Sequence, residues 1–500
     1  MRFDELLHEN ETIRITGHAD LDVGGLTYRS QDVGSGWLFA AIPGSKVDGH
    51  DFIPKAIAAG ARALIVENEP LDIPENVVTA VVKDSRRALA KAAGRFYGHP
   101  SRRMKLIGVT GTNGKTTTAF IIESILGRGG RKPAVIGTIN YRFGKNVTPA
   151  TVTTPESVDM QSMLARMIEM GADSAVVEVS SHALEQGRVW GMRFAARVFT
   201  NLSRDHLDYH GSMDKYFEAK SILFTDNEFA ASGPAVVNSD DMWGKKLIAK
   251  IGPGVISYAI DDPEAMVKPL DWKTGPDGTY IRVKTPSWEG ELKSPMMGRL
   301  NVYNVLASVA AAEAAGIEPE AVKDGVEALE KVPGRLEPVE NSKGVTVLVD
   351  YSHTPDALEK AIVAVREFTT GKLFVVFGCG GDRDRGKRPI MGRLAARNAD
   401  LALVTSDNPR TENPMSIISE ILEGVKETGS EPIEAGVYPD GERNYRVEPD
   451  RRKAIMEAIR TSREGDSVLI AGKGHEDYQI LGDKKIHFDD REVAREALGE

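Results

Sequence analysis

The chain has 500 residues, a length that predicts about three domains of ~150 residues each. Its 63 basic and 73 acidic side chains give a net charge of −10, which argues against broad electrostatic binding to nucleic acid or to a membrane. The single cysteine, Cys379, excludes an internal disulfide framework and is typical of a reducing compartment. The acidic start lacks a signal-peptide pattern, and no apolar run approaches the ~20 residues that cross a bilayer. We therefore expect a cytoplasmic protein.

Residues 1–102 are predicted to form a small N-terminal α/β domain. Short apolar runs at 37–42, 63–66 and 78–82 predict strands, whereas 52–59 and 86–97 have the spacing of helices. The sequence Gly98-His99-Pro100 ends the last helix and predicts a domain boundary.

Residues 103–333 are predicted to form a central domain. Strands alternate with helices, which indicates a mostly parallel sheet of the P-loop ATPase type. Short β segments around Gly275-Pro276-Asp277-Gly278 predict a peripheral hairpin. Helices at 307–315 and 319–331 complete the domain.

A glycine-rich stretch near the start of this domain predicts a phosphate site. Gly111-Thr112-Asn113-Gly114-Lys115-Thr116-Thr117 lies between an apolar strand at 106–109 and a run with helical spacing. Backbone N–H groups of such a turn point inward, and the helix N-terminus carries partial positive charge. Lys115 offers a charge to the outer phosphates, and Thr116 offers a hydroxyl to Mg²⁺. Because the usual spacing would put the first glycine at Val109, the loop is non-standard, and a plain flexible turn is the alternative.

Residues 334–500 are predicted to form a C-terminal Rossmann-like α/β domain. Four apolar strands, at 345–349, 373–377, 401–404 and 467–471, each run into a polar or glycine-rich loop. Ligands of open α/β sheets bind beyond the carboxyl ends of the strands, so the four loops predict one binding face. Ordinary turn chemistry is the alternative for some of their residues.

Two residues of the central domain are candidate Mg²⁺ ligands. Glu178 ends an apolar strand at 175–177, and His206 lies in the polar stretch 203–210 that follows the next strand. Mg²⁺ prefers carboxylates, waters and substrate phosphates, which suits an acid at this edge of the sheet. A salt bridge would explain Glu178 equally well, and an isolated loop histidine is more often merely exposed.

Lys220 is unusual because it lies on an apolar helix face. In the helix predicted at 215–224, Tyr216, Phe217, Lys220, Leu223 and Phe224 share one side. A lysine there snorkels, pairs with an acid or changes chemically. Burial lowers a lysine pKa, and the neutral amine can then react with CO₂ to give a carbamate, an oxygen ligand that Mg²⁺ accepts. Snorkelling remains the alternative from the residues alone.

Three motifs carry a family resemblance over nearly the whole chain. They are the phosphate loop above, Gly298-Arg299-Leu300-Asn301-Val302-Tyr303-Asn304, and Val332-Pro333-Gly334-Arg335. The chain resembles the Mur ligase family, ATP-dependent amide-forming enzymes of peptidoglycan precursor synthesis. The resemblance implies that residues 111–117, Asn301, Arg335 and Asp350 bind ATP. It also implies that Lys220 is carbamylated and that Mg²⁺ is held by Thr116, Glu178, His206 and Lys220, so that Lys115, Glu178, His206 and Lys220 are catalytic.

The resemblance also implies the acceptor, a UDP-N-acetylmuramoyl-L-alanyl-D-glutamate. The stretch Glu178-Val179-Ser180-Ser181-His182-Ala183-Leu184, with Gln186 and Arg188, matches the family pattern for the muramoyl dipeptide, as do Thr153 and Thr154. The N-terminal domain would hold the UDP group, with Ser30 at the family's serine position. There the chain departs from the pattern, because Arg29-Ser30-Gln31 replaces the usual Asp-Ser-Arg.

The last domain is expected to choose the incoming amino acid. Asp407-Asn408-Pro409-Arg410 resembles the form found in members that add meso-diaminopimelate, whose second carboxylate suits an arginine fork. The resemblance adds Arg383, Gly472 and Glu476 to this site, with Glu476 suited to an ammonium group.

These residues predict a monomeric ligase that forms an acyl phosphate and then an amide, with only small-molecule partners. A lysine-adding or folate-type ligase on the same scaffold is the nearer alternative. A P-loop switch is the alternative from a different class, but it leaves Lys220 unexplained.

Overall fold

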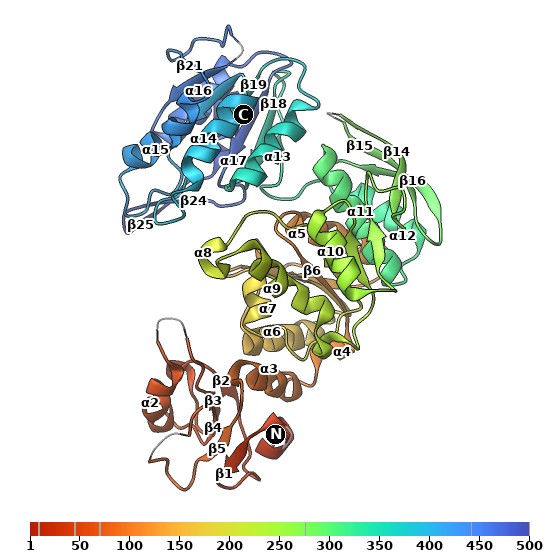
Figure 1. Cartoon of the computed structure of the whole chain (residues 1–500), viewed down its shortest axis with the longest axis vertical. Helices are drawn as coiled ribbons and strands as arrows, with labels where there is room; N and C mark the ends of the chain where they lie inside the picture. The colour runs from red at the N-terminus through yellow and green to blue at the C-terminus, as the bar shows by residue number, and fades with distance from the viewer. Residues whose placement is uncertain (9–10, 45–46, 70–71, 276, 442, 500) are drawn as a thin grey trace.

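The computed structural model describes residues 1–8, 11–44, 47–69, 72–275, 277–441 and 443–499. Three α/β units follow one another along the long axis of the molecule, with the N-terminal unit at one end and the C-terminal unit at the other (Figure 1). Among the described helices, none is long and apolar enough to cross a membrane.

The first unit is built on a five-stranded sheet in the order β1-β5-β4-β3-β2. Strands β2, β3, β4 and β5 are parallel, and β1 pairs antiparallel with β5. The three strands predicted from apolar runs are present, whereas β1 and β2 were not predicted. The elements are α1 (Phe3–Leu6), β1 (Arg14–Thr16), β2 (Leu26–Thr27), β3 (Leu38–Ala40), α2 (Ile53–Ala58), β4 (Ala63–Val66), β5 (Val78–Val81), α3 (Ser85–Phe96) and α4 (Pro100–Arg103), with 3-10 turns at Ser30–Asp32 and Gly49–Phe52.

The second unit is built on an eight-stranded sheet in the order β13-β12-β11-β6-β10-β7-β8-β9. The sheet is parallel from β13 to β7, as predicted, and only the β7–β8 and β8–β9 pairs are antiparallel. Its strands are β6 (Lys105–Thr110), β7 (Pro133–Ile136), β8 (Asn140–Phe143), β9 (Asn146–Pro149), β10 (Ser174–Glu178), β11 (Ala196–Phe199), β12 (Ala235–Asn238) and β13 (Ile256–Tyr258).

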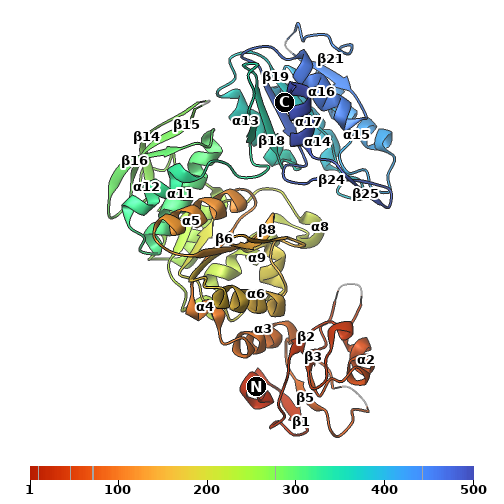
Figure 2. The ribbon, with the colours of Figure 1, turned by 180° about the vertical axis from the view of Figure 1, so that it is seen from behind.

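Helices cover both faces of this sheet (Figure 2). One core joins α5, α11 and α12 to residues such as Val109 and Val176, and the other joins α6 and α9 to residues such as Leu106 and Val177. Because successive strand residues point to opposite faces, neighbouring valines and leucines enter different cores. The helices are α5 (Lys115–Arg128), α6 (Ser157–Glu169), α7 (Ser181–Glu185), α8 (Leu207–His210), α9 (Met213–Thr225), α10 (Met242–Ile251), α11 (Arg299–Ala314) and α12 (Pro319–Ala328), with a 3-10 turn at Asn227–Phe229.

A separate antiparallel sheet flanks the second unit, in the order β14-β15-β16. Its strands are β14 (Lys268–Gly275), β15 (Gly278–Lys284) and β16 (Glu289–Ser294). The predicted hairpin is therefore present as the β14–β15 pair, although Pro276 of its turn lies outside the described residues.

The third unit is built on a seven-stranded sheet in the order β17-β18-β23-β19-β20-β22-β21. The four predicted strands, β18, β23, β19 and β20, are adjacent and parallel, so their polar loops meet at one edge. The elements are β17 (Glu337–Val339), β18 (Thr346–Asp350), α13 (Pro355–Arg366), β19 (Leu373–Phe377), α14 (Lys387–Asn398), β20 (Leu401–Val404), α15 (Pro414–Lys426), β21 (Glu431–Pro432), β22 (Asn444–Val447), α16 (Arg451–Thr461), β23 (Ser467–Ala471), β24 (Tyr478–Leu481), β25 (Lys484–His487) and α17 (Asp490–Leu498).

The linker between the second and third units passes through Gly334. Its backbone has φ 65°, and a Cβ atom there would lie 2.2 Å from the backbone nitrogen of His475. Its N–H donates to Glu337 Oε2 at 2.8 Å, and its carbonyl accepts from the Tyr351 N–H at 2.9 Å. Only glycine fits this close approach, so the linker lies tightly against loops of the third unit.

Candidate functional site

The phosphate loop joins β6 to α5, and two of its glycines are required by its geometry. Gly111 has φ 143°, and a Cβ atom there would lie 1.9 Å from Thr200 Oγ1, while Gly114 has φ 86°. The Lys115 ammonium folds back over the loop and donates to the carbonyls of Gly111 and Thr112, both at 2.9 Å. The loop thus has the conformation of an anion site, with Lys115 held directly above it.

Glu178 lies beside Thr116 at the start of α5. Parallel pairing of β10 with β6 places Glu178 opposite Val109, just before the loop. Its carboxylate accepts from the Thr116 hydroxyl at 2.9 Å and from the Thr138 N–H at 2.9 Å, and it is 1 % exposed. Arg335, from the third unit, donates to the same Thr116 hydroxyl at 3.3 Å. The structure therefore brings a carboxylate, a hydroxyl and a guanidinium together at the helix N-terminus.

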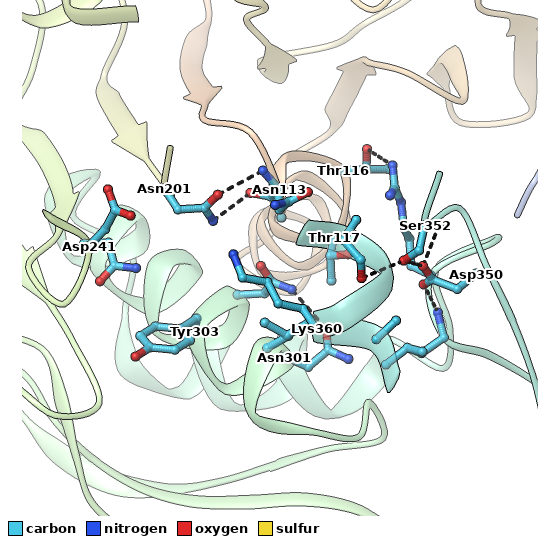
Figure 3. Close-up of a pocket in the computed structure, with 18 of the residues that line it drawn as sticks. Asn113, Thr116, Thr117, Asn201, Asp241, Asn301, Tyr303, Asp350, Ser352 and Lys360 are labelled. Carbon is cyan, nitrogen blue, oxygen red and sulfur yellow. Dashed lines mark hydrogen bonds between the residues drawn. The ribbon is translucent and has the colours of Figure 1, made fainter. Parts of the chain in front are cut away.

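A cavity of about 290 Å³ opens from the phosphate loop between the second and third units. Figure 3 shows Asn301 and Asp350 on its wall, together with Asn113, Thr116 and Thr117. The predicted ATP residues in its lining are Asn113, Gly114, Thr116, Thr117, Asn301, Arg335 and Asp350, whereas Gly111, Thr112 and Lys115 are not part of the lining. Its size, mixed polarity and phosphate loop suit a nucleotide.

Some residues of this cavity were not predicted. Tyr303 donates to Asp240 Oδ2 at 2.8 Å, and Lys360 pairs with Asp356 at 2.9 Å one turn earlier in α13. Tyr303 lies inside the motif 298–304, so the sequence could have indicated its place in the cavity. Lys360 gave no signal, because its position depends on how the third unit packs against the second.

Lys220 is buried beneath the phosphate loop. It is 2 % exposed, so its ammonium does not snorkel to bulk water. Its Nζ donates to the Gly111 carbonyl at 2.9 Å and lies 4.7 Å from the centre of the Tyr216 ring. Burial, followed by the nearby Lys115 charge, holds the pKa of Lys220 well below its ordinary value. A neutral, nucleophilic amine is the chemical consequence.

His206 faces a group of aromatic rings on α7, α8 and α9. Its backbone is left-handed, with φ 52°, and its Nε2 lies 3.4 Å from Asp205 Oδ2. Its ring centre is 5.0 Å from that of His182, which in turn contacts Tyr209 and His210. Although 47% of the His206 side chain is exposed, partial desolvation lowers its pKa against the opposing Asp205 charge, so the imidazole is neutral and can act as a ligand.

The predicted metal ligands do not by themselves form a complete coordination shell for a metal ion. Among the described residues, no cluster of three or more His, Cys, Asp or Glu side chains could hold a metal ion. The oxygens of Thr116 and Glu178 are nevertheless the hard donors that Mg²⁺ prefers, and they lie beside the phosphate loop. Mg²⁺ commonly takes few protein ligands and completes its shell with water and phosphate oxygens, so these residues fit it.

A second cleft, of about 750 Å³, lies between the second and third units. Its lining includes six of the seven residues predicted to bind diaminopimelate, namely Arg383, Asp407, Asn408, Arg410, Gly472 and Glu476, whereas Pro409 is not part of it. The second unit contributes His182, Asp205 and His206. We call this space the amine cleft.

The charged groups of the amine cleft are held by their neighbours. Asn408 donates to Glu476 Oε2 at 3.1 Å, and Arg410 donates to the Gly381 carbonyl at 2.7 Å from a left-handed backbone with φ 51°. Burial raises the pKa of Glu476, although the nearby Lys473 charge opposes the rise. Arg383 is exposed on its loop and keeps its guanidinium available to a ligand.

The residues expected to hold the muramoyl dipeptide converge at the carboxyl edge of the central sheet, next to Glu178, whose carbonyl accepts from the Thr154 hydroxyl at 2.8 Å. Thr154 donates to Ser180 Oγ at 3.3 Å, and Arg188 donates to Gln186 Oε1 at 2.7 Å and to the Thr154 carbonyl at 2.8 Å. Thr153 lies 3.2 Å from Thr138 through their hydroxyls. All five predicted residues of the second unit therefore surround one edge of the sheet.

A third cavity, of about 420 Å³, lies where the first unit meets the second. Arg188 lines it, and so do Tyr28 and Arg29, but the predicted Ser30 is buried next to them and is not part of the lining. Arg29 pairs with Asp159 of α6 at 3.3 Å, and Tyr28 donates to the same carboxylate at 2.9 Å. The unusual arginine therefore joins the two units.

Comparison with protein families agrees with this geometry. Residues 22–106 match the model described as the Mur ligase family catalytic domain, 109–312 match the Mur ligase middle domain, and 334–474 match the Mur ligase glutamate ligase domain. The chain belongs to the Mur ligase family. The resemblance identified from the sequence motifs is thus confirmed.

Curated relatives extend over the full length of the chain. A UDP-N-acetylmuramoyl-L-alanyl-D-glutamate--2,6-diaminopimelate ligase of Geobacter metallireducens is 46% identical over 509 residues and covers 100% of this chain and 99% of the relative. The enzyme of the same name from Gloeobacter violaceus is 47% identical over 480 residues, covering 96% of this chain and 94% of the relative.

Solved structures share the fold. A UDP-N-acetylmuramoyl-L-alanyl-D-glutamate--2,6-diaminopimelate ligase superposes with a TM-score of 0.72 at 33% identity, covering 100% of this chain and 99% of that one. The MurF ligase of Thermotoga maritima in complex with ADP has a TM-score of 0.60 at 20% identity, covering 96% and 98% of the two chains. The α/β fold class with three domains, predicted from the sequence, is confirmed.

Proposed function

We propose that this chain is an ATP-dependent ligase that adds meso-diaminopimelate to the D-glutamate of UDP-N-acetylmuramoyl-L-alanyl-D-glutamate. One observation carries the proposal. The loop after β18 contributes Asp350 and Ser352 to the nucleotide cavity, and it contributes Tyr351 and His353 to the amine cleft. Alternate residues of one short loop thus separate the nucleotide from the incoming amine, as a ligase that couples ATP to amide formation requires.

The reaction proceeds through an acyl phosphate. ATP transfers its γ-phosphoryl group to the side-chain carboxylate of the D-glutamate, and ADP is the leaving group. The amine then attacks the acyl carbon, phosphate leaves, the amide forms and the amine loses a proton. Phosphorylation is needed because a carboxylate is a poor electrophile. Lys115 and Arg335 lie where they would neutralise charge on the transferring group.

Thr116, Glu178, His206 and a carbamylated Lys220 would hold Mg²⁺, which supplies charge neutralisation to the phosphates. For Lys220, the support is its burial, its lowered pKa and its contact with the Gly111 carbonyl. Addition of CO₂ to the neutral amine forms an N–C bond and releases one proton. The product is an anion beside Lys115, whose positive charge would pair with it.

The UDP-muramoyl dipeptide would enter through the third cavity. Thr153, Thr154, Ser180, Gln186 and Arg188 would hold the peptide, with Arg188 suited to a carboxylate or phosphate through two parallel hydrogen bonds. Ser30 would contact the UDP group, which the first unit would hold. Its neighbour Arg29 is directed at the cavity in this chain, so we assign the guanidinium to the diphosphate region.

The amine cleft would select diaminopimelate by charge. Arg383 and Arg410 would pair with its carboxylates, whereas Asp407 and Glu476 would receive an ammonium group. Gly472, Asn408 and Pro409 would shape the pocket between them. We further assign the enzyme to the cytoplasm, as a monomer without nucleic-acid or membrane partners.

The test is phosphate release with ATP, Mg²⁺ and the UDP-muramoyl dipeptide, offering meso-diaminopimelate or L-lysine in parallel. Release with diaminopimelate alone is the expected result. Release with lysine alone would keep the ligase and overturn the specificity assigned to Arg410. Release without any amine would favour the rival P-loop switch, which hydrolyses nucleotide without an acceptor.

The variant Arg410→Lys tests directly whether Arg410 selects diaminopimelate. Lysine keeps the positive charge but loses the planar fork, so we expect a higher KM for diaminopimelate at an unchanged KM for ATP. A matched control is Arg282→Lys, at an exposed position of β15 that lines neither cavity, which should leave both constants unchanged.

A further inference from the structure

Lys473 is a buried cation that the proposed reaction leaves unexplained. It lies between Gly472 and Gly474, in the loop that follows β23, and its side chain has no exposed surface. Its ammonium donates to Asn408 Oδ1 at 3.1 Å and to the Tyr478 carbonyl at 2.6 Å. Burying an ammonium is costly unless its donors and its charge are matched. Its surroundings must therefore explain its presence.

The charge of Lys473 is matched by two carboxylates of the amine cleft. Asp407 Oδ1 lies 3.4 Å from its Nζ, and Glu476 Oε2 lies 3.8 Å away. Asp407 Oδ1 has no hydrogen-bond partner among the described residues, although it is buried. Lys473 by itself offsets only one of the two acids, so the pair can also receive the ammonium group of a substrate.

Lys473 also sets the orientation of the Asn408 side chain. Asn408 Oδ1 accepts from Lys473 and from the Ile480 N–H at 3.0 Å, so this atom must be the amide oxygen. The amide nitrogen is then left to donate to Glu476 Oε2 at 3.1 Å. Removing Lys473 would leave the amide free to turn and would weaken the support of Glu476.

We propose that Lys473 is the positioning residue of the amine cleft, holding Asp407, Asn408 and Glu476 in the orientation and the ionised state that receive a substrate ammonium. This inference rests on the proposed function, since it assumes that an amine enters this cleft. Lys473 itself lines neither the amine cleft nor the nucleotide cavity, so it acts through its three partners.

The ionised state of Glu476 depends on several neighbours. Burial and the Asp407 charge raise its pKa, whereas Lys473 and the Asn408 amide lower it. Other charged or titratable groups that act on this site include Tyr351, Cys379, Arg410, Arg451 and Tyr478. Without Lys473, the Asp407 charge and burial would raise the pKa of Glu476 unopposed by that cation, so Glu476 would hold its proton to higher pH.

The test is the KM for diaminopimelate of Lys473→Met between pH 6.5 and pH 9. At the acid end we expect a KM raised about tenfold or more, the equivalent of one lost charge-assisted hydrogen bond. The KM should fall towards the wild-type value as pH rises and Glu476 loses its proton. The KM values for ATP and for the UDP-muramoyl dipeptide should stay unchanged. Lys473→Arg keeps the cation and should show a profile as flat as that of the wild type.

An unchanged KM, or one raised equally at every pH, would overturn the positioning role. Turnover of diaminopimelate by the wild type tests the proposed function separately from the role of Lys473. If the wild type does not turn over diaminopimelate, the proposed function is overturned, and not the role of Lys473 alone. Folding gives a second readout. In Lys473→Met the folded acids bind protons more tightly than the unfolded ones, so its melting temperature relative to the wild type should fall as pH rises. A deficit independent of pH, including failure to fold at every pH, would also count against the inference.

Discussion

At the scale of single residues, Lys220 gives the sharpest prediction. Arginine keeps the positive charge but cannot form a carbamate, so Lys220→Arg should lower ligase activity by about 10–100-fold, the usual cost of disturbing the groups around a metal. Steady-state phosphate release with all three substrates measures the loss. Full activity of this variant would contradict carbamylation.

The smaller variant Lys220→Ala is the companion experiment. It leaves space beneath the phosphate loop, so short carboxylic acids should restore part of the activity by supplying the missing anionic oxygens. The same acids should not restore Lys220→Arg, whose side chain fills the space.

The sequence predicted the site residues whose signal is local. The phosphate loop and the Asp407–Arg410 stretch are contiguous motifs, and Glu178 ends an apolar run. Lys473 and Arg29 were missed as functional residues because their roles depend on partners distant in the chain, Asp407 for the first and Asp159 for the second. Periodicity and spacing carry no information on such pairs.

At the scale of elements, the pair between α16 and α17 holds the C-terminal helix. Arg451 and Asp490 have no exposed side-chain surface, and they form two parallel hydrogen bonds of 2.8 and 2.6 Å. Arg451→Met would leave Asp490 buried and unpaired, which should cost about 3–5 kcal/mol. Hydrogen exchange of α17 should become much faster in this variant. The double variant Arg451→Met/Asp490→Leu should recover most of the protection, and failure to do so would locate the loss elsewhere.

Helix α14 is joined to the segment that precedes α15 by a pair that is sensitive to acid. The hydrogen bond from Arg388, assisted by the Asp382 N–H, lowers the pKa of Glu412 to about 2. Because the folded pKa lies below the unfolded one, this stabilisation is complete above about pH 5 and is lost as pH falls towards 2. The protection of the amides in 378–388 against hydrogen exchange, measured relative to the intrinsic rate at each pH, should therefore fall as the pH is lowered through this range. In Glu412→Gln, this protection should be low and should vary less with pH.

The sheet order shows which strands a sequence can reveal. Strands β19, β20 and β23 were predicted at their observed bounds, because a central parallel strand is buried on both faces and reads as a continuous apolar run. Strand β22, Asn444–Val447, was missed because its sequence Asn-Tyr-Arg-Val has no such run. Its position comes from pairing with β20, which only the folded chain provides.

At the scale of the whole molecule, Asp356 connects the second and third units. From the start of α13, its carboxylate accepts from Asn113 of the phosphate loop at 2.6 Å and from Ser203 at 2.7 Å. Asp356→Ala removes both bonds, so we expect a larger radius of gyration in small-angle scattering without ligands. Asp356→Asn keeps an acceptor oxygen, so its radius of gyration should lie between those of Asp356→Ala and the wild type. Identical profiles for all three would show that other contacts fix the arrangement.

The close approach at Gly334 bears on the exchange of parts between related enzymes. Its hydrogen bonds reach Glu337 and Tyr351, and the absent Cβ makes room for His475, so every partner described for it belongs to the C-terminal unit. A chimera that replaces this unit must therefore carry the linker glycine with it. A junction placed before Val332 keeps Gly334 in the same protein as Glu337, Tyr351 and His475. A junction placed after Gly334 would put this glycine against the loops of a different C-terminal unit, which need not fit its backbone.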